Sequence, residues 1–163
     1  MLKEKLTEKM IVFYKGNIRD INHFIKVHAF ASLIGKMEGI DAETLNTLEI
    51  AAIVHDIACP LCREKYGNTN GARQEEESEA LLVEFLREFH LSPEVEKRVI
   101  FLVTHHHTYD AVNGIDYQIL LEADFLVNAG ESEKYATAIG QFRKNVFKTA
   151  TGHRLLKEIH DGT

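Results

Sequence analysis

Apolar residues recur at helical spacing along almost the whole chain, and this periodicity restricts the fold more than any other feature. Side chains three or four positions apart lie on one face of an α-helix. Strand-like alternation is scarce, and only two prolines, Pro60 and Pro93, interrupt the pattern. The sequence therefore predicts an all-α fold, a compact helical bundle.

Capping residues indicate where several of these helices begin. Either Asn17 or Asp20 can cap the second helix, and Asp41 can cap the third. Ser92 followed by Pro93 is a typical helix start, because proline is well tolerated at the first helical position. The helical spacing predicts further helices over residues 74–90 and 117–128 and a final pair beyond them.

Two segments lack this periodicity. Residues 58–73 contain Pro60, Gly67 and Gly71 and are predicted to form a long loop, a common location for functional residues. Residues 109–114 are predicted to form a second, shorter loop. Since the sequence shows no repeat, linker or low-complexity stretch, residues 1–163 are expected to form one domain.

Composition limits the functional classes. The net charge of −6 argues against a nucleic-acid-binding surface, and no apolar stretch is expected to cross a membrane. The N-terminus has no signal-peptide core, and Cys59 and Cys62 fit a reducing compartment, so a cytoplasmic protein is predicted. A homodimer through an exposed apolar face of the first or last helix is left open.

The dipeptide His55-Asp56 follows the apolar run 48–54 and precedes Pro60. Adjacent side chains cannot share one face in the middle of a helix, but at a helix end both can be directed to one point. An imidazole nitrogen and a carboxylate oxygen together are suitable ligands for a divalent metal. If that is their role, further ligands must come from elsewhere in the chain.

His23 and Asp124 are candidates for these further ligands, because each lies in an otherwise apolar helix. A buried carboxylate without a partner is costly, and a shared ion would compensate all four groups. The donor set His23, His55, Asp56 and Asp124 mixes nitrogen and oxygen. It suits Mn²⁺, Fe²⁺, Mg²⁺, Co²⁺ or Zn²⁺ better than a metal that prefers thiolates.

This order of residues resembles the HD-domain superfamily of metal-dependent phosphohydrolases. The segment from Asp20 to Ala31 is similar to the first-ligand helix of that family, 48–57 to the His-Asp signature, and 123–126 to the last-ligand helix. The likeness covers about residues 18–130. It implies an all-α fold with one or two divalent metals bound by His23, His55, Asp56 and Asp124. The family pattern selects His23 over His28, since Val27 and Ala31 then fall in register.

The resemblance also suggests roles for residues 74–77. Gln74, Glu75 or Glu77 could face the metal site, although an acidic first turn is also favoured by the helix dipole alone. Family members with two metals carry a histidine in this region. This chain lacks it, so one ion is favoured over two. Gln74 is expected to bind substrate and Glu75 to take part in catalysis.

Other candidates lie near the ends of helices. Among His105, His106 and His107, we expect His105 first and His106 second to face the site, and His107 to be exposed. Lys26 and Arg73 are candidate phosphate contacts. Cys59 and Cys62 form a CxxC pattern without a second pair, so a neutral spacer is favoured over a zinc or redox motif.

The predicted function is metal-dependent hydrolysis of a phosphate ester of a nucleotide or another small phosphorylated metabolite. Asp56 would bind the metal and orient the attacking water, while His105 or Glu75 would transfer protons and His106 would contact the substrate. Alternatives are an HD-type metalloenzyme with a non-phosphate substrate, a catalytically silent metal- or nucleotide-binding regulator, and a purely structural bundle.

Overall fold

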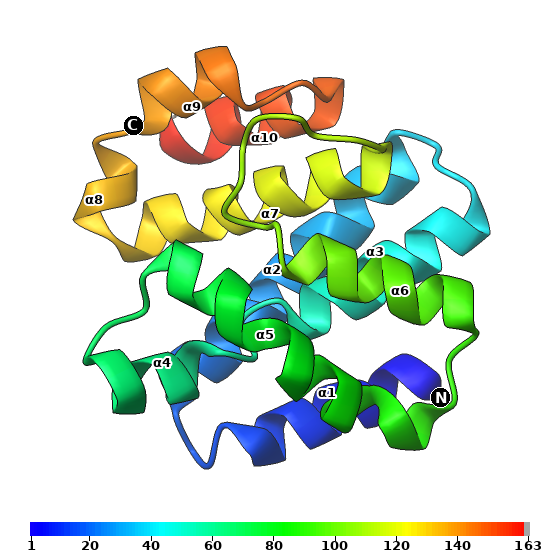
Figure 1. Cartoon of the computed structure of the whole chain (residues 1–163). Helices are drawn as coiled ribbons and strands as arrows, with labels where there is room; N and C mark the ends of the chain where they lie inside the picture. Colours follow the sequence, from blue (N-terminus) through cyan, green and yellow to red (C-terminus); the bar gives the residue numbers. More distant parts are fainter. Residues whose placement is uncertain (162–163) are drawn as a thin grey trace.

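The computed structural model describes residues 1–161, and these contain helices and turns but no strand, as the periodicity predicts (Figure 1). The elements in chain order are α1 (Leu2–Phe13), α2 (Ile18–Met37), α3 (Ala42–Val54), α4 (Cys59–Tyr66), α5 (Gly71–Leu86), the 3-10 helix η1 (Arg87–Phe89), α6 (Pro93–Val103), α7 (Ile115–Glu131), α8 (Glu133–Ala136), α9 (Ile139–Asn145) and α10 (Ala150–His160).

The centre of the bundle consists of α2, α3 and α7, which pack against one another. Helix α3 is buried continuously from Thr47 to Val54, and nearly all of α7 is buried as well. Both helices are apolar around most of their circumference, which is the pattern of a helix enclosed by others. Helix α6 covers α3, while α1 and α8–α10 lie at opposite ends of the molecule (Figure 1).

The predicted caps begin their helices. The Asn17 side chain accepts a hydrogen bond from the backbone N–H of Asp20, so Asn17 is the cap of α2. Asp41 accepts from two backbone N–H groups at the start of α3, and Ser92 accepts from one at the start of α6. Each such cap stabilises its helix by about 1 kcal/mol. The residues that position α2 and α3 are therefore visible in the sequence.

The prediction of a loop over 58–73 is wrong for most of that segment. Helix α4 occupies Cys59–Tyr66, because Pro60 lies in its first turn, where a missing N–H is not needed. Gly67, with φ of 70°, ends α4 in the left-handed conformation, and Asn70 caps α5. Only the short connection 67–70 between these helices is irregular.

The prediction that no apolar stretch is long enough to cross a membrane is wrong, because one stretch passes that test by length and composition. An 18-residue window within Ala42–Tyr66 has a mean hydropathy of 1.3. However, 72% of that window is buried inside the molecule, and the chain leaves the helical path at residues 55–58. This apolar stretch therefore contributes the central layer of the bundle.

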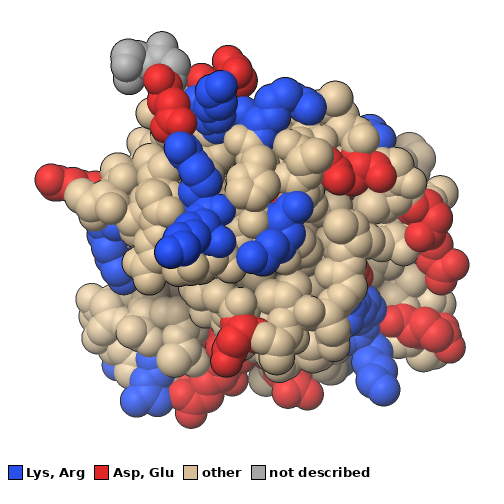
Figure 2. Space-filling model, turned by 90° about the horizontal axis from the view of Figure 1, so that it is seen from above, with Lys and Arg blue, Asp and Glu red and all other residues tan. Residues whose placement is uncertain are grey.

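Charge is distributed unevenly over the surface. Seen from the end formed by the C-terminal helices, Lys and Arg side chains gather near the middle, while Asp and Glu lie mostly toward the edge (Figure 2). Residues 134–157 contain no Asp or Glu and carry Lys134, Arg143, Lys144, Lys148, Arg154 and Lys157. The net charge of −6 therefore coexists with locally positive surface.

Candidate metal centre

The break after α3 brings His55 and Asp56 to one point. The helix ends at Val54, and residues 55–58 form a turn before α4 begins. The hydroxyl of Tyr14 donates a hydrogen bond to the backbone carbonyl of Asp56 (3.0 Å), which fixes this turn against α1. As a result, His55 Nε2 lies 3.6 Å from Asp56 Oδ2, although the two residues are adjacent in the chain.

Donor atoms from α2 and α7 complete the cluster. His23 Nε2 lies 3.1 Å from Asp124 Oδ1, 3.3 Å from His55 Nε2 and 3.4 Å from Asp56 Oδ2. Asp124 Oδ1 is also 3.5 Å from His55 Nε2. Donors bound to one ion at about 2.0–2.2 Å lie roughly 3–3.5 Å apart in tetrahedral or octahedral geometry. His23, His55 and Asp56 therefore have the spacing of ligands around one ion, and Asp124 lies at the same spacing from the two histidines.

Hydrogen bonds turn the correct ring nitrogens toward this point. His55 Nδ1 lies 2.8 Å from the carbonyl of Ala52 and donates to it, which leaves Nε2 with a free lone pair. His23 Nδ1 lies 2.8 Å from the carboxylate of Glu131, the arrangement that commonly orients a metal-binding histidine. Asn128 donates to Asp124 Oδ1 (2.9 Å). The supporting contacts thus fit a metal site.

A second group of possible ligands adjoins the first through Asp56. Its other carboxylate oxygen, Oδ1, lies 3.4 Å from His106 Nε2, and His107 has a ring nitrogen within 4.8 Å of both. His106 Nδ1 donates to the carbonyl of Val103 (2.7 Å). The Nε2 atoms of His106 and His107 are buried and have no hydrogen-bond partner among the described residues. Buried unpartnered acceptors are uncommon in proteins, and a cation would satisfy them.

The electrostatics of the cluster favour a cation. Burial alone would raise the pKa of Asp124, but the hydrogen bond from His23 holds it well below its usual value. Burial also opposes ionisation of Asp56, yet the neighbouring histidines lower its pKa. Burial would lower the pKa of His23, whereas its hydrogen bond to Asp124 and the charge of Asp56 raise it to about 10. In the metal-free protein, a proton on His23 therefore compensates these carboxylates.

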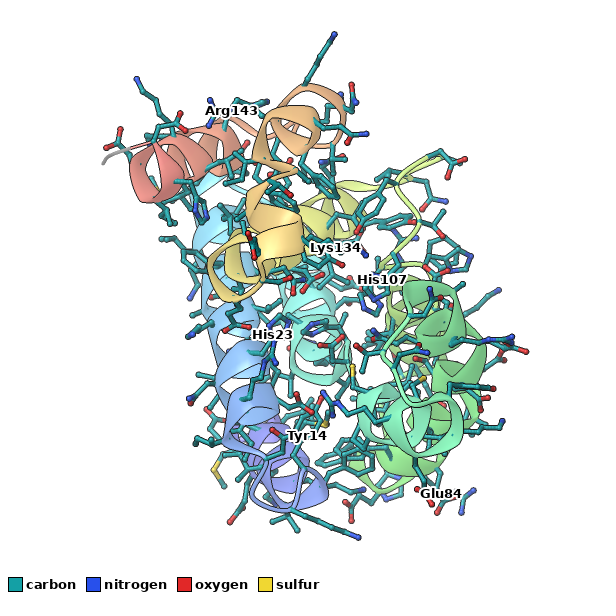
Figure 3. The ribbon with its side chains drawn as sticks, turned by 90° about the vertical axis from the view of Figure 1, so that its left-hand side faces the viewer. Tyr14, His23, Glu84, His107, Lys134 and Arg143 are labelled. Atoms are coloured by element: carbon teal, nitrogen blue, oxygen red, sulfur yellow. The ribbon has the colours of Figure 1, made fainter. Side chains whose placement is uncertain are left out.

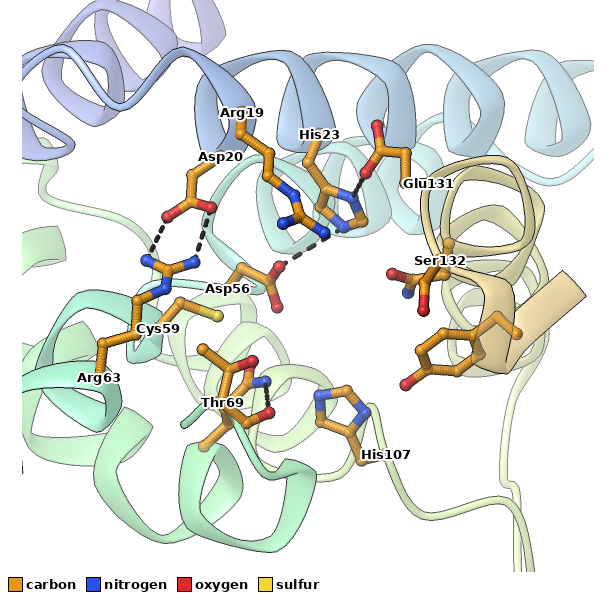
Figure 4. Close-up of a pocket in the computed structure, with 13 residues that line it drawn as sticks. Arg19, Asp20, His23, Asp56, Cys59, Arg63, Thr69, His107, Glu131 and Ser132 are labelled. Atoms are coloured by element: carbon orange, nitrogen blue, oxygen red, sulfur yellow. Dashed lines mark hydrogen bonds and ion pairs between the residues drawn. The ribbon is translucent and has the colours of Figure 1, made fainter. Parts of the chain in front are cut away.

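A polar pocket with a volume of about 230 Å³ gives access to the cluster. His23 and His107 face each other across the gap between α2 and the turn after α6 (Figure 3). The wall also includes Arg19, Arg63 and Glu131, together with Asp20, Asp56, Cys59, Thr69, Gln74, Asn128, Ser132 and Tyr135 (Figure 4). A small polar molecule can thus reach Asp56, whose side chain is 20% exposed.

Comparison with protein families identifies this architecture. The family model described as "HD domain" matches residues 20–156, which is most of the chain. The chain belongs to the HD-domain family. HD domains form a superfamily of metal-dependent phosphohydrolases, and the resemblance of residues 18–130 is confirmed over a longer range.

Solved structures with the same fold include two of the Bacillus subtilis protein YpgQ. One is the selenomethionine form, with 22% identity, a TM-score of 0.62 and coverage of 99% of this chain and 89% of that chain. The other is YpgQ in complex with ADP, with 22% identity, a TM-score of 0.65 and coverage of 99% and 90%. No significant match was found among curated proteins.

Within this HD domain, the histidines after α6 differ from our expectation. His105 is turned away from the cluster: its Nδ1 contacts the carbonyl of Phe101 (2.8 Å), and its ring stacks on the Phe101 ring. His106 is fully buried beside Asp56. The expectation that His107 would be exposed is wrong, because it is largely covered and lines the pocket. Burial and the neighbouring charge of His106 lower the pKa of His107 to about 3, so its ring is neutral.

The two candidates at the start of α5, Gln74 and Glu75, have different positions relative to the pocket. Gln74 is buried and lines the pocket, and its side chain donates to the carbonyl of Thr69 (2.9 Å). Glu75 accepts hydrogen bonds from the backbone N–H of His107 (2.9 Å) and from the hydroxyl of Thr108. It therefore holds the histidine turn in place and is not among the residues that line the pocket.

The remaining candidates do not line the pocket over the donor cluster. Lys26 is exposed and binds Glu131 (2.9 Å), so it supports His23 indirectly. Arg73 is exposed, binds Glu76 (2.7 Å) and lines a separate depression beside the pocket. The side chain of Glu77 binds Lys65 and Tyr66. None of these three residues lines the pocket over the cluster.

The two cysteines are free and buried. Burial raises the pKa of both thiols, which keeps them protonated at neutral pH. Cys59 contributes to the pocket wall. Their environment thus agrees with the neutral spacer that we expected in preference to a redox pair.

Several site residues were missed by the sequence reasoning. Glu131 and Asn128 support the ligands from the same helix as Asp124, at positions i+7 and i+4 relative to it. That spacing places all three on one face of α7, which is a signal the sequence does contain. Arg63 binds Asp20 through two hydrogen bonds, of 2.6 and 2.7 Å. Nothing local to either residue indicates this pairing across 43 positions.

Proposed function

We propose that this HD-domain protein hydrolyses a phosphate ester of a nucleotide or another small phosphorylated metabolite in a metal-dependent reaction. The observation that carries the proposal is the cluster of His23, His55, Asp56 and Asp124 at the base of an open polar pocket. Hydrolytic metal sites need such a donor set and an accessible side where substrate and water can enter.

The likeness to YpgQ supports a nucleotide as the substrate class. That protein was solved in complex with ADP, and the two chains share their fold over nearly their whole lengths. ADP has phosphate groups that could bind the metal and a polar nucleoside that could contact the polar side chains lining the pocket. ADP is therefore the first compound to test.

Several residues around the pocket would have distinct roles in the proposed reaction. A bound divalent cation would supply Lewis-acid activation of water and neutralise charge on the phosphoryl group. Glu131 and Asn128 would keep His23 and Asp124 oriented throughout the reaction. The buried Nε2 of His107 is unpartnered among the described residues, and because the ring is neutral this nitrogen would offer its lone pair to a second ion. The proton transfer expected of His105 or Glu75 stays a prediction.

The second group of donors bears on the number of ions. Asp56 offers Oδ2 to the first cluster and Oδ1 to His106, so a second ion would share this carboxylate. We expect one tightly bound ion at the four-donor cluster and a weaker second ion beside His106 and His107. Titration of metal-free protein with Mn²⁺, followed by calorimetry and compared with His106→Ala, would distinguish one ion from two.

The test is turnover. Purified protein would be incubated with ADP and a panel of phosphorylated metabolites, with Mn²⁺, Mg²⁺, Co²⁺ or Zn²⁺ added separately, and released phosphate or pyrophosphate measured. Asp56→Asn should abolish turnover, and Asp110→Asn, an exposed carboxylate away from the pocket, should not change it. Absence of turnover by the unaltered protein, or full turnover by Asp56→Asn, would contradict the phosphohydrolase proposal. Metal-dependent turnover of non-phosphorylated compounds would indicate another type of hydrolase.

A further inference from the structure

Arg19 lines the pocket that gives access to the donor cluster. It lies on the first turn of α2, four residues before His23, which puts both side chains on the same side of the helix. Four residues correspond to about 6 Å along the helix axis. The guanidinium group of Arg19 is directed over the pocket toward His23 and Asp56 (Figure 4). Arg19 also lies just outside the matched HD-domain region, 20–156.

Among residues 1–161, the side chain of Arg19 has no hydrogen-bond or ion-pair partner, unlike that of the other arginine in the pocket wall. The other arginine there, Arg63, is held by Asp20 through two hydrogen bonds (Figure 4). Within residues 1–161, no hydrogen bond or ion pair engages the side chain of Arg19. Isolated surface arginines are common, but this one lines a pocket that ends in candidate metal ligands.

The carboxylates of the pocket wall and of the donor cluster are already engaged. Asp20 is neutralised by Arg63, and Glu131 contacts both Lys26 and His23. Asp56 and Asp124 belong to the metal cluster, where a cation would compensate them. With these groups satisfied, the strongest remaining partner for the Arg19 guanidinium is an anion that enters the pocket with the substrate.

We infer that Arg19 binds a phosphate group of the substrate and thereby sets the preference of the pocket for phosphorylated compounds. This inference rests on the proposed phosphohydrolase function and names one residue that would confer it. A guanidinium group presents paired N–H donors that match two phosphate oxygens, which an ammonium group cannot reproduce. Arg19 thus replaces Lys26 and Arg73 as the principal phosphate contact.

Binding measurements test this inference without requiring turnover. The affinity of the Mn²⁺-loaded protein for α,β-methylene-ADP, in which the α–β linkage cannot be hydrolysed, would be measured by calorimetry, with a check that no adenosine is released from its 5′ ester. Adenosine is the uncharged comparison. Arg19→Gln should weaken binding of the analogue roughly tenfold or more, the effect of losing a hydrogen bond between charged groups. Arg19→Lys should recover only part of the affinity. Binding of adenosine should not change.

The control is Arg87→Gln, which removes the same charge from an exposed arginine paired with Glu84 and remote from the pocket. It should bind the analogue like the unaltered protein. Unchanged affinity of Arg19→Gln, equal weakening by Arg87→Gln, or no measurable binding by the unaltered protein would overturn the inference. If Arg19-dependent binding occurs while no phosphate ester is hydrolysed, the phosphate contact stands and the proposed catalytic function fails.

Discussion

Two histidines on one helix provide a direct test of the metal centre. His23 and His28 are five residues apart on α2, but only His23 points into the donor cluster. His28 is partly buried on another side of α2, where it lines a depression together with Glu49. Replacing each with glutamine removes one imidazole from the same helix. We expect His23→Gln to lose metal-dependent stabilisation and His28→Gln to retain it.

The size of the effect follows from binding linkage. A metal present at 100 times its Kd stabilises the folded protein by about 2.7 kcal/mol. For a chain of this size, each kcal/mol shifts Tm by about 2–4 °C, so the metal should raise Tm by roughly 5–11 °C. Removing one ligand should weaken affinity at least as much as losing an orienting contact, about 100-fold. At the same metal concentration, the stabilisation then falls to about 0.4 kcal/mol, or roughly 1 °C.

Thermal unfolding followed by circular dichroism would measure these shifts, with chelated protein as the baseline for each variant. Comparing each variant with its own chelated form removes the cost of the substitution itself. The reasoning is refuted if His23→Gln keeps the full metal-induced shift. It is also refuted if His28→Gln loses the shift while His23→Gln does not, because His28 would then be the ligand.

Three further outcomes are expected. Although burial opposes it, neighbouring carboxylates raise the pKa of His23 from 6.5 to about 10. The metal-free protein should therefore lose stability as pH rises from 6.5 to 10, whereas metal affinity should rise, because metal binding requires loss of that proton. Denaturation and metal titrations at both ends of this pH range would check the two opposite signs. Gly71→Ala would place a Cβ 2.6 Å from Cγ of His107, so kcat/KM measured well below Tm should fall by about tenfold or more. Gly152→Ala would place a Cβ against a carboxylate oxygen of buried Glu122. Urea denaturation should show that the free energy of unfolding falls by at least about 2 kcal/mol, with unchanged metal affinity.

The candidate metal ligands stand out in the sequence because each is conspicuous in its local surroundings. Asp124 lies in a helix that is apolar on nearly every side, where an uncompensated carboxylate would be costly. His55 and Asp56 follow a buried run and coincide with the end of α3. A polar residue within an apolar pattern is expected to be buried, and burial costs free energy unless the residue has a partner. Such a residue can therefore be recognised as a candidate site residue from the sequence. The caps of α2, α3 and α6 were visible for a similar reason, since a cap acts within its own turn.

The residues that were misjudged depend on contacts between distant segments. Three consecutive histidines at the end of α6 point in different directions, and the helix itself does not determine which of them faces the site. Glu75, from another helix, accepts a hydrogen bond from the backbone of His107 and so fixes how the chain turns after α6. That turn directs His106 and His107 inward and leaves His105 against Phe101. The identity of the second donor group is therefore decided by the packing of α5 against α6, which periodicity within either helix does not specify.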